Sequence, residues 1–224
     1  MDYKQYIAYH NKGDAGVEER MIASLAKYYN MSLWDSFRLV YYYTTTYHIP
    51  SALKLYFNPN TPKKELKFRT DRRYVRIGDT YEKVIRQLQP SLLKQLDAAK
   101  TTTQQYNIVS GWYFFGRYAT FLFLEVWSKL NKKQIVDDLI LNWEENENYT
   151  KGAVQIVGTS NKEQLNIFID NAKKDTNDNV FSLETSLCAV CKIKKGTRWE
   201  GYYTERLLED VRGSEYESLI LSLL

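Results

Sequence analysis

The chain has 224 residues, 44% of them hydrophobic and 15% aromatic, which is enough to bury a core without disulfides or metals. This composition argues against disorder, and the longest uncharged stretches are shorter and more polar than the roughly 20 apolar residues of a membrane-spanning helix. A net charge of +4 means that any nucleic-acid contact must rest on local clusters. The ten glycines and four prolines amount to about 6% of the chain against an average near 12%, which favours a mostly α fold.

The N-terminal residues lack the apolar core of a signal peptide. The two cysteines lie three residues apart and cannot form a disulfide framework. We therefore expect a cytoplasmic protein with no membrane partner.

The sequence predicts where helices start from a capping pattern. Ser, Thr or Asp caps the first turn when an acidic or amide residue follows three positions later. We interpret four such pairs as helix starts: Ser32 and Asp35, Asp79 and Glu82, Thr101 and Gln104, and Ser160 and Glu163. The expected helices span residues 16–29, 32–48, 79–98, 102–130, 160–174, 180–195 and 201–212.

Proline and glycine mark helix ends and kinks. Pro50 should end the helix over residues 32–48, Pro90 should kink the helix over residues 79–98, and Gly196 should follow the helix over residues 180–195. Residues 58–67 and 148–159 are expected to be loops, the second with a strand-like apolar run. No repeat or flexible linker divides the chain, so we expect a single compact helical domain over residues 1–224.

One segment, residues 63–76, holds seven cations against two anions. If residues 68–77 are helical, four guanidinium groups share one face and suit phosphate oxygens. The alternative is a solvated charged surface, although Phe68 and Tyr74 favour nucleic acid because rings beside cations stack on bases. The four arginines are Arg69, Arg72, Arg73 and Arg76.

Two charges, Arg117 and Glu125, lie within the most apolar expected helix, with Tyr118 close to the same face. A buried ion without a partner costs several kcal/mol, so each of these two groups must have an ion-pair partner, be hydrated in a cavity, or act in catalysis or binding. They predict either a phosphate clamp with a general base or a structural ion pair to another helix.

Several further residues are weaker candidates. His48 is either a proton carrier or a histidine that meets a helix C-terminal dipole. Cys188 and Cys191 are expected in the core, and Glu184 on the same helix is counted with the substrate-binding residues. Lys195 belongs to a second basic and aromatic cluster that either neutralises a helix end or contacts a phosphate backbone.

The chain lacks GxGxxG, GxxxxGK[ST], HExxH and GxSxG motifs, so dinucleotide-binding, nucleotide-hydrolysing, zincin and serine-hydrolase functions lose their main support. A divalent cation such as Mg²⁺ would be the one metal to consider, but no carboxylate cage for it is visible in the sequence.

Four segments, in chain order, together resemble one family: residues 46–50 (TYHIP), 68–75 (FRTDRRYV), 115–121 (FGRYATF) and 186–189 (SLCA). They resemble the α-glutamyl/putrescinyl-thymine pyrophosphorylases, the amino-acid:DNA transferases of phage thymine hypermodification. The resemblance implies a helical, DNA-glycosylase-like fold. It implies that an amino acid or polyamine displaces pyrophosphate from 5-hydroxymethyluracil in DNA, in an infected bacterial cell. A hydroxymethyluracil DNA kinase would be the functional partner.

The resemblance also implies roles for the candidate residues. Arg69, Arg72, Arg73 and Arg117 would hold the leaving pyrophosphate or the DNA backbone. Glu125 or Asp71 would orient or deprotonate the amine, with His48 as a further proton carrier. Tyr47, Tyr118 and Trp112 would stack on an extruded base, because base chemistry usually requires flipping. The alternatives are a non-catalytic nucleic-acid-binding module and a glycosylase-like enzyme acting on modified bases.

Overall fold

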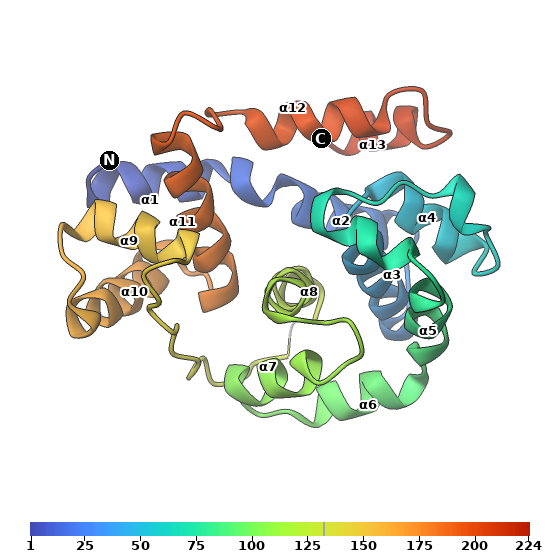
Figure 1. The fold of residues 1–224 in the computed structure, drawn as a ribbon, viewed down its shortest axis with the longest axis horizontal. Coiled ribbons are helices and arrows are strands. Elements are labelled where there is room, and N and C mark those ends of the chain that lie inside the picture. Colours follow the sequence, from blue (N-terminus) through green and yellow to red (C-terminus); the bar gives the residue numbers. More distant parts are fainter. Residues whose placement is uncertain (132) are drawn as a thin grey trace. The chain divides into compact units, whose positions relative to one another are not determined.

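The computed structural model describes residues 1–131 and 133–224, and the side chains of Thr70 and Asp71 also lie outside the described part (Figure 1). The chain is mostly helical, which confirms the predicted fold class. Among the described residues there is no β-strand, and a bridge pairs Thr101 with Val136.

The helices form two compact units, each built from two stretches of the chain. Unit 1 contains Met1–Val17 and Asp137–Arg206, and unit 2 contains Glu18–Val136 and Leu207–Leu224. The expectation of one domain over residues 1–224 stays a prediction.

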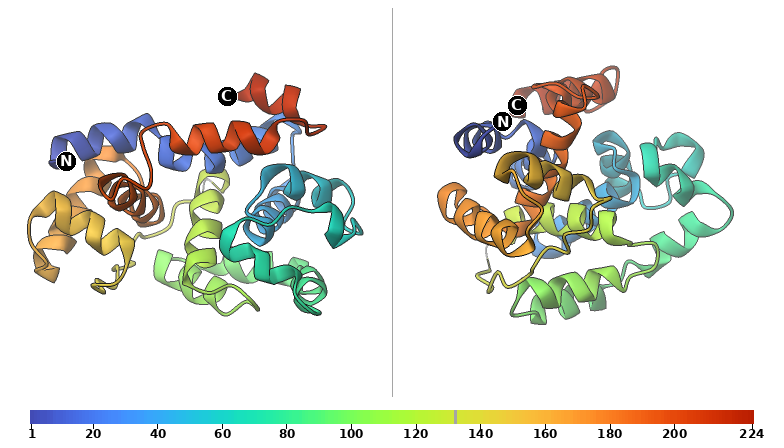
Figure 2. Two further views of the ribbon diagram at one scale, coloured as in Figure 1. Left: turned by 45° about the horizontal axis from the view of Figure 1, so that its top comes forward. Right: turned by 60° about the vertical axis from the view of Figure 1, so that its left-hand side comes forward.

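Unit 1 packs four helices against one another, and Figure 2 shows α1 beside α9, α10 and α11. The α9–α11 contact is close because Gly152 carries no side chain and faces the backbone of Leu187. The helices are α1 (Tyr3–Lys12), α9 (Asn148–Val157), α10 (Lys162–Thr176) and α11 (Val180–Lys194).

The start of α12 (Tyr202–Val211) is capped by a residue far away in sequence. The Asp14 carboxylate accepts hydrogen bonds from the backbone N–H groups of Gly201 and Thr204, both at 3.1 Å, and from the Thr204 hydroxyl at 2.8 Å. This carboxylate satisfies amides that the first turn of a helix leaves without partners.

In unit 2, helix α8 packs against α3 and α7, and aromatic rings fill the space between them. Phe37 of α3 meets Trp112, Phe123 and Trp127 edge-on at 5.5–5.9 Å, a geometry that aromatic pairs favour. Besides the remainder of α12, the helices of unit 2 are α2 (Val17–Tyr28), α3 (Leu33–Thr46), α4 (Ile49–Phe57), α5 (Thr80–Gln87), α6 (Pro90–Ala98), α7 (Thr102–Ser110), α8 (Arg117–Leu130) and α13 (Glu217–Leu223). Its 3-10 segments are η2 (Lys63–Glu65) and η3 (Thr70–Arg76), whereas η1 (Asp14–Gly16) belongs to unit 1.

Two long helices expected from the sequence are broken in the structure. Pro90 begins α6 rather than kinking one helix, since Gln89 before it is extended. Residues 111–116 separate α7 from α8, and Phe114 there has a left-handed φ of 66°. The prediction of a loop over residues 148–159 was wrong, because helix α9 covers residues 148–157.

Two of the four predicted helix caps are present in the structure. The Ser32 and Thr101 side chains accept from the amides of Asp35 and Gln104. Asn161 replaces Ser160 as the cap of α10, and Asp79 makes no side-chain cap bond.

Candidate functional site

The centre of the candidate site is Arg69, whose guanidinium bridges two carboxylates in unit 2. It pairs with Glu18 at the start of α2 and with Asp210 near the end of α12. The Arg69 side chain is 10% exposed, and its backbone N–H donates to Thr46 O at 3.1 Å. This arginine therefore joins three separate segments of the chain.

Two aromatic residues with left-handed backbones lie beneath two arginines of the same segment. Tyr47, with a φ of 50°, lies 5.5 Å below the guanidinium of Arg69. Phe114, with a φ of 66°, lies 5.9 Å below that of Arg72, which also donates to Phe114 O at 3.5 Å. Bulky residues rarely adopt this conformation, and such strain concentrates at functional positions.

A pair of acidic residues extends this network into the interior of the unit. The Tyr43 hydroxyl donates to Glu18 at 2.8 Å and lies 3.5 Å from Glu19. Burial, together with the charge of Glu18, raises the pKa of Glu19 to about 7. The same two acids, after burial itself, raise the pKa of Tyr43 well above its usual value. The network can therefore take up or release a proton near neutral pH.

His48 caps α4 rather than ending α3, which corrects the expected role at a helix C-terminus. Its Nδ1 accepts from the Ser51 amide at 3.2 Å and lies 2.9 Å from the Ser51 hydroxyl. Its Nε2 lies 3.9 Å from Asp210. Burial, then the charges of Arg69, Lys67 and Lys54, lowers the pKa of His48 to about 3. The imidazole is therefore neutral at physiological pH and a poor proton carrier.

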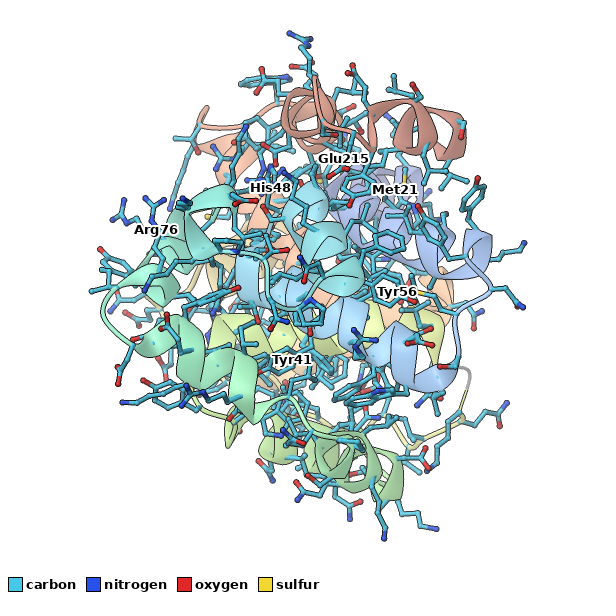
Figure 3. All side chains as sticks on the ribbon, turned by 90° about the vertical axis from the view of Figure 1, so that its right-hand side faces the viewer. Met21, Tyr41, His48, Tyr56, Arg76 and Glu215 are labelled. Atoms are coloured by element: carbon cyan, nitrogen blue, oxygen red, sulfur yellow. The ribbon has the colours of Figure 1, made fainter. Side chains whose placement is uncertain are left out.

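A pocket of about 460 Å³ opens in front of His48 and Asp210. Figure 3 labels His48 and Glu215, which line it from α4 and from the α12–α13 connection. Its wall mixes three basic side chains with three acidic ones: Lys54, Lys67, Arg212, Glu65, Asp210 and Glu215.

The arginine stripe expected over residues 68–77 does not form, because Arg69 precedes the segment in an extended conformation and Thr70–Arg76 is a 3-10 helix. Arg69 therefore shares no helix face with the others, and with three residues per turn Arg73 and Arg76 share a face that Arg72 does not. Arg69 and Arg72 turn inward, whereas Arg73 and Arg76 are exposed. Figure 3 shows Arg76 projecting from the surface.

The three predicted stacking rings have different surroundings. Trp112 is 6% exposed and packs in the aromatic core, which disfavours base stacking by its ring. Tyr47 is buried beneath Arg69 and contacts Tyr118 at 5.9 Å. Tyr118 is 44% exposed and is the one ring of the three available to a base.

Arg117 and Glu125 occupy the same helix, α8, at different depths. Arg117 is half-buried at the first turn, 5.6 Å from the Phe121 ring. Glu125 is 1% exposed, so it does not lie on the floor of an open cleft. Both residues make further interactions, which fits the structural alternative at least as well as the phosphate clamp.

Glu184 and Lys195 belong to unit 1, whereas the other predicted residues belong to unit 2. Glu184 is buried on α11 and accepts a hydrogen bond from the Cys188 thiol at 3.6 Å, and Lys195 donates to Asn148 at 3.4 Å. The side chain of Asp71 lies outside the described residues.

Sequence reasoning missed Glu18, Glu19, Ser51 and Asp210. Glu18 and Glu19 resemble ordinary acidic residues of a first helical turn, and Asp210 lies on the polar face of an amphipathic helix. The one available signal was the TYHIP segment, which places Tyr47 and His48 next to a helix boundary.

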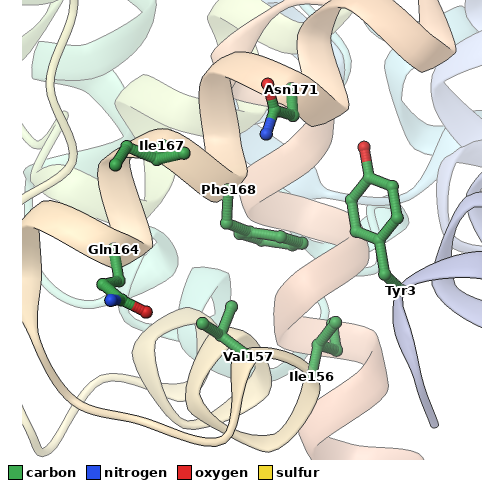
Figure 4. Close-up of a pocket in the computed structure, with 7 residues that line it drawn as sticks. All are labelled: Tyr3, Ile156, Val157, Gln164, Ile167, Phe168 and Asn171. Carbon is green, nitrogen blue, oxygen red and sulfur yellow. The ribbon is translucent and has the colours of Figure 1, made fainter.

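A second pocket, of about 420 Å³, lies in unit 1 and is mostly apolar (Figure 4). Tyr3 at its edge donates to Asp175 at 2.6 Å, and burial with this bond raises the pKa of Tyr3 to about 12. The pocket lining supplies no acid or base for chemistry near neutral pH.

No family model, curated protein or solved structure matches this chain. Within the described residues, no group of three or more His, Cys, Asp or Glu side chains is placed to hold a metal ion. The helices that the structure describes are also too short or too polar to cross a membrane.

Proposed function

We propose that the protein transfers a small amine, such as an amino acid or polyamine, onto pyrophosphorylated 5-hydroxymethyluracil in DNA. The proposal rests on the sequence resemblance and on one structural observation. Residues 63–76 supply both a wall of the polar pocket and exposed arginines. A small donor and a polyanion would therefore bind along the same segment.

The pocket suits a zwitterionic donor. Asp210, held by Arg69, and Glu65 offer carboxylates to an ammonium group, and Lys67 and Lys54 offer ammonium groups to a carboxylate. Charge-assisted hydrogen bonds of this kind fix orientation, which accounts for much of the rate gain in a two-substrate reaction.

The chemistry is a displacement at the methylene carbon of the modified base. The amine nitrogen forms a bond to that carbon while the carbon–oxygen bond breaks, and pyrophosphate leaves with the electron pair. The donor's ammonium group first gives one proton to a pocket carboxylate, which frees the nitrogen lone pair for attack, and the alkylated nitrogen then loses its additional proton to solvent. Arginine side chains such as Arg73 and Arg76 would stabilise the charge that develops on the leaving group. Asp210 thereby takes the orienting role first expected of Glu125 or Asp71.

The test incubates the protein with DNA that carries pyrophosphorylated 5-hydroxymethyluracil and with a mixture of amino acids and polyamines. Mass spectrometry of the nucleosides should show a heavier, intact nucleotide. Lys67→Ala should lower the yield at least tenfold, whereas Lys64→Ala, an exposed lysine of the same segment outside the pocket, should not. Abasic sites would indicate a glycosylase instead.

A second candidate function is non-catalytic nucleic-acid binding. It is favoured by Arg73, whose guanidinium lies 4.9 Å over the ring of Tyr74, itself 50% exposed. This function predicts salt-sensitive binding to ordinary DNA or RNA and no change in nucleoside mass.

A further inference from the structure

A second basic and aromatic surface lies in unit 1, at the junction of α11 and α12. Within residues 192–206 the sequence holds five cations against Glu200 and Glu205. Glu200 pairs with Lys12 at 3.1 Å, and Glu205 accepts a hydrogen bond from the Trp199 indole at 3.1 Å. The contacts of Arg198, Trp199 and Arg206 with Tyr202 form what we name the Trp199 platform, and Lys192, Lys194 and Lys195 precede it in the sequence.

The rings and guanidinium groups of the platform are layered. The Arg198 guanidinium lies 4.0 Å from the centre of the Tyr202 ring, and Trp199 meets that ring edge-on at 5.0 Å. Arg206 approaches the same ring at 6.0 Å. Trp199 is 51% exposed, so about half of its side chain is open to a ligand. Its indole nevertheless has a fixed orientation, because Glu205 accepts its N–H.

The backbone beneath the rings is also held in place. The Asp14 carboxylate binds the amides of Gly201 and Thr204, on either side of Tyr202. Gly201 has a φ of 92°, a conformation that favours glycine and lets the chain turn sharply after Trp199. The ring face is therefore ordered before any ligand arrives, which lowers the entropic cost of binding.

We infer that the Trp199 platform binds an unpaired nucleic-acid strand. An exposed, oriented indole stacks on any base, but only where the base face is not already covered by a neighbouring pair. The lysines at the C-terminus of α11 supply cations for the phosphates of the same strand. An acidic peptide would use the cations without needing the ring, so the ring distinguishes the two partners.

This site is separate from the pocket of the proposed function, and unmodified nucleic acid suffices to test it. Fluorescence anisotropy with the full chain at low salt should show that a labelled 12-nucleotide thymidine strand binds more tightly than a hairpin duplex of the same length. The two proposals can then fail independently.

Trp199→Ala should weaken strand binding at least fivefold, and Trp199→Phe, which keeps a stacking ring, should restore most of it. Arg198→Ala should also weaken binding and reduce its salt dependence. Tyr28→Ala removes another highly exposed ring, and Lys162→Ala another exposed cation, and neither should change binding more than twofold. Circular dichroism verifies that each variant is folded.

Equal affinity for strand and duplex, or Trp199→Ala binding as tightly as the unaltered chain, would overturn the inference. Poly-glutamate that displaces the strand equally well from the unaltered chain and from Trp199→Ala would identify an acidic protein partner instead.

Discussion

Replacing Arg69 by methionine is the sharpest test of the network at the candidate site. The substitution keeps most of the apolar stem but removes the charge that Glu18 and Asp210 share. Glu18 and Asp210 would then both lose the guanidinium that they contact. Breaking a buried ion pair costs about 3–5 kcal/mol, because the remaining partner keeps its desolvation penalty.

The geometry places the expected loss at the lower end of that range. The Glu18 side chain is 3% exposed but that of Asp210 is 22% exposed, so water compensates part of the second charge. We expect a loss of about 3 kcal/mol in the free energy of unfolding, which lowers the melting temperature by roughly 6–12 °C for a chain of this length. Urea denaturation at neutral pH measures the loss directly.

Arg73→Met is the matched control, because Arg73 is exposed on the same segment and should cost at most about 0.5 kcal/mol. A deficit below about 1 kcal/mol at neutral pH would refute an ion-pair role for Arg69.

Three other substitutions or measurements address single features of the fold. The pKa of Glu19 is raised from 4.5 to about 7, so the folded state binds a proton that the unfolded state has lost, and stability falls as pH rises between these two values. Glu19→Gln should therefore flatten the dependence of the urea midpoint on pH. An unchanged slope would exclude Glu19 as its source. His48, with a pKa lowered to about 3, should show no NMR titration between about pH 5 and 8, and stability from this group should fall only below the unfolded pKa of about 6.5. A Cβ on Gly152 would lie 2.1 Å from Leu187 O, so Gly152→Ala should lose about 3 kcal/mol or more by urea denaturation, unlike Gly116→Ala, which meets nothing within 4 Å.

The helical fold class followed from composition and caps, but the breaks within helices did not. Residues 102–130 have the apolar spacing of one helix, but residues 111–116 interrupt it, with a left-handed backbone at Phe114 and an extended one at Gly116. That conformation costs free energy locally, and Phe114 contacts Arg72, a residue 42 positions away along the chain. Local patterns contain no information about such partners.

The candidate site shows the same division between local and long-range information. The cation-rich segment 63–76 was visible as a charge cluster, and Arg69 within it is central to the observed network. Its partners, Glu18 and Asp210, are 51 and 141 residues away along the chain, so no spacing rule connects them to it. A 3-10 rather than an α-helical segment then decided which arginines face inward.

Because Asp210 comes from the last stretch of the chain, the Arg69 network also has a bearing on how the protein is made. A nascent polypeptide that has emerged from the ribosome as far as residue 136 already holds Arg69 and Glu18, yet it still lacks the second carboxylate. The assembly of unit 2 therefore finishes only after translation has passed unit 1. Chains cut short before Asp210 would leave Arg69 paired with Glu18 alone and would lack one of the three segments that the guanidinium joins.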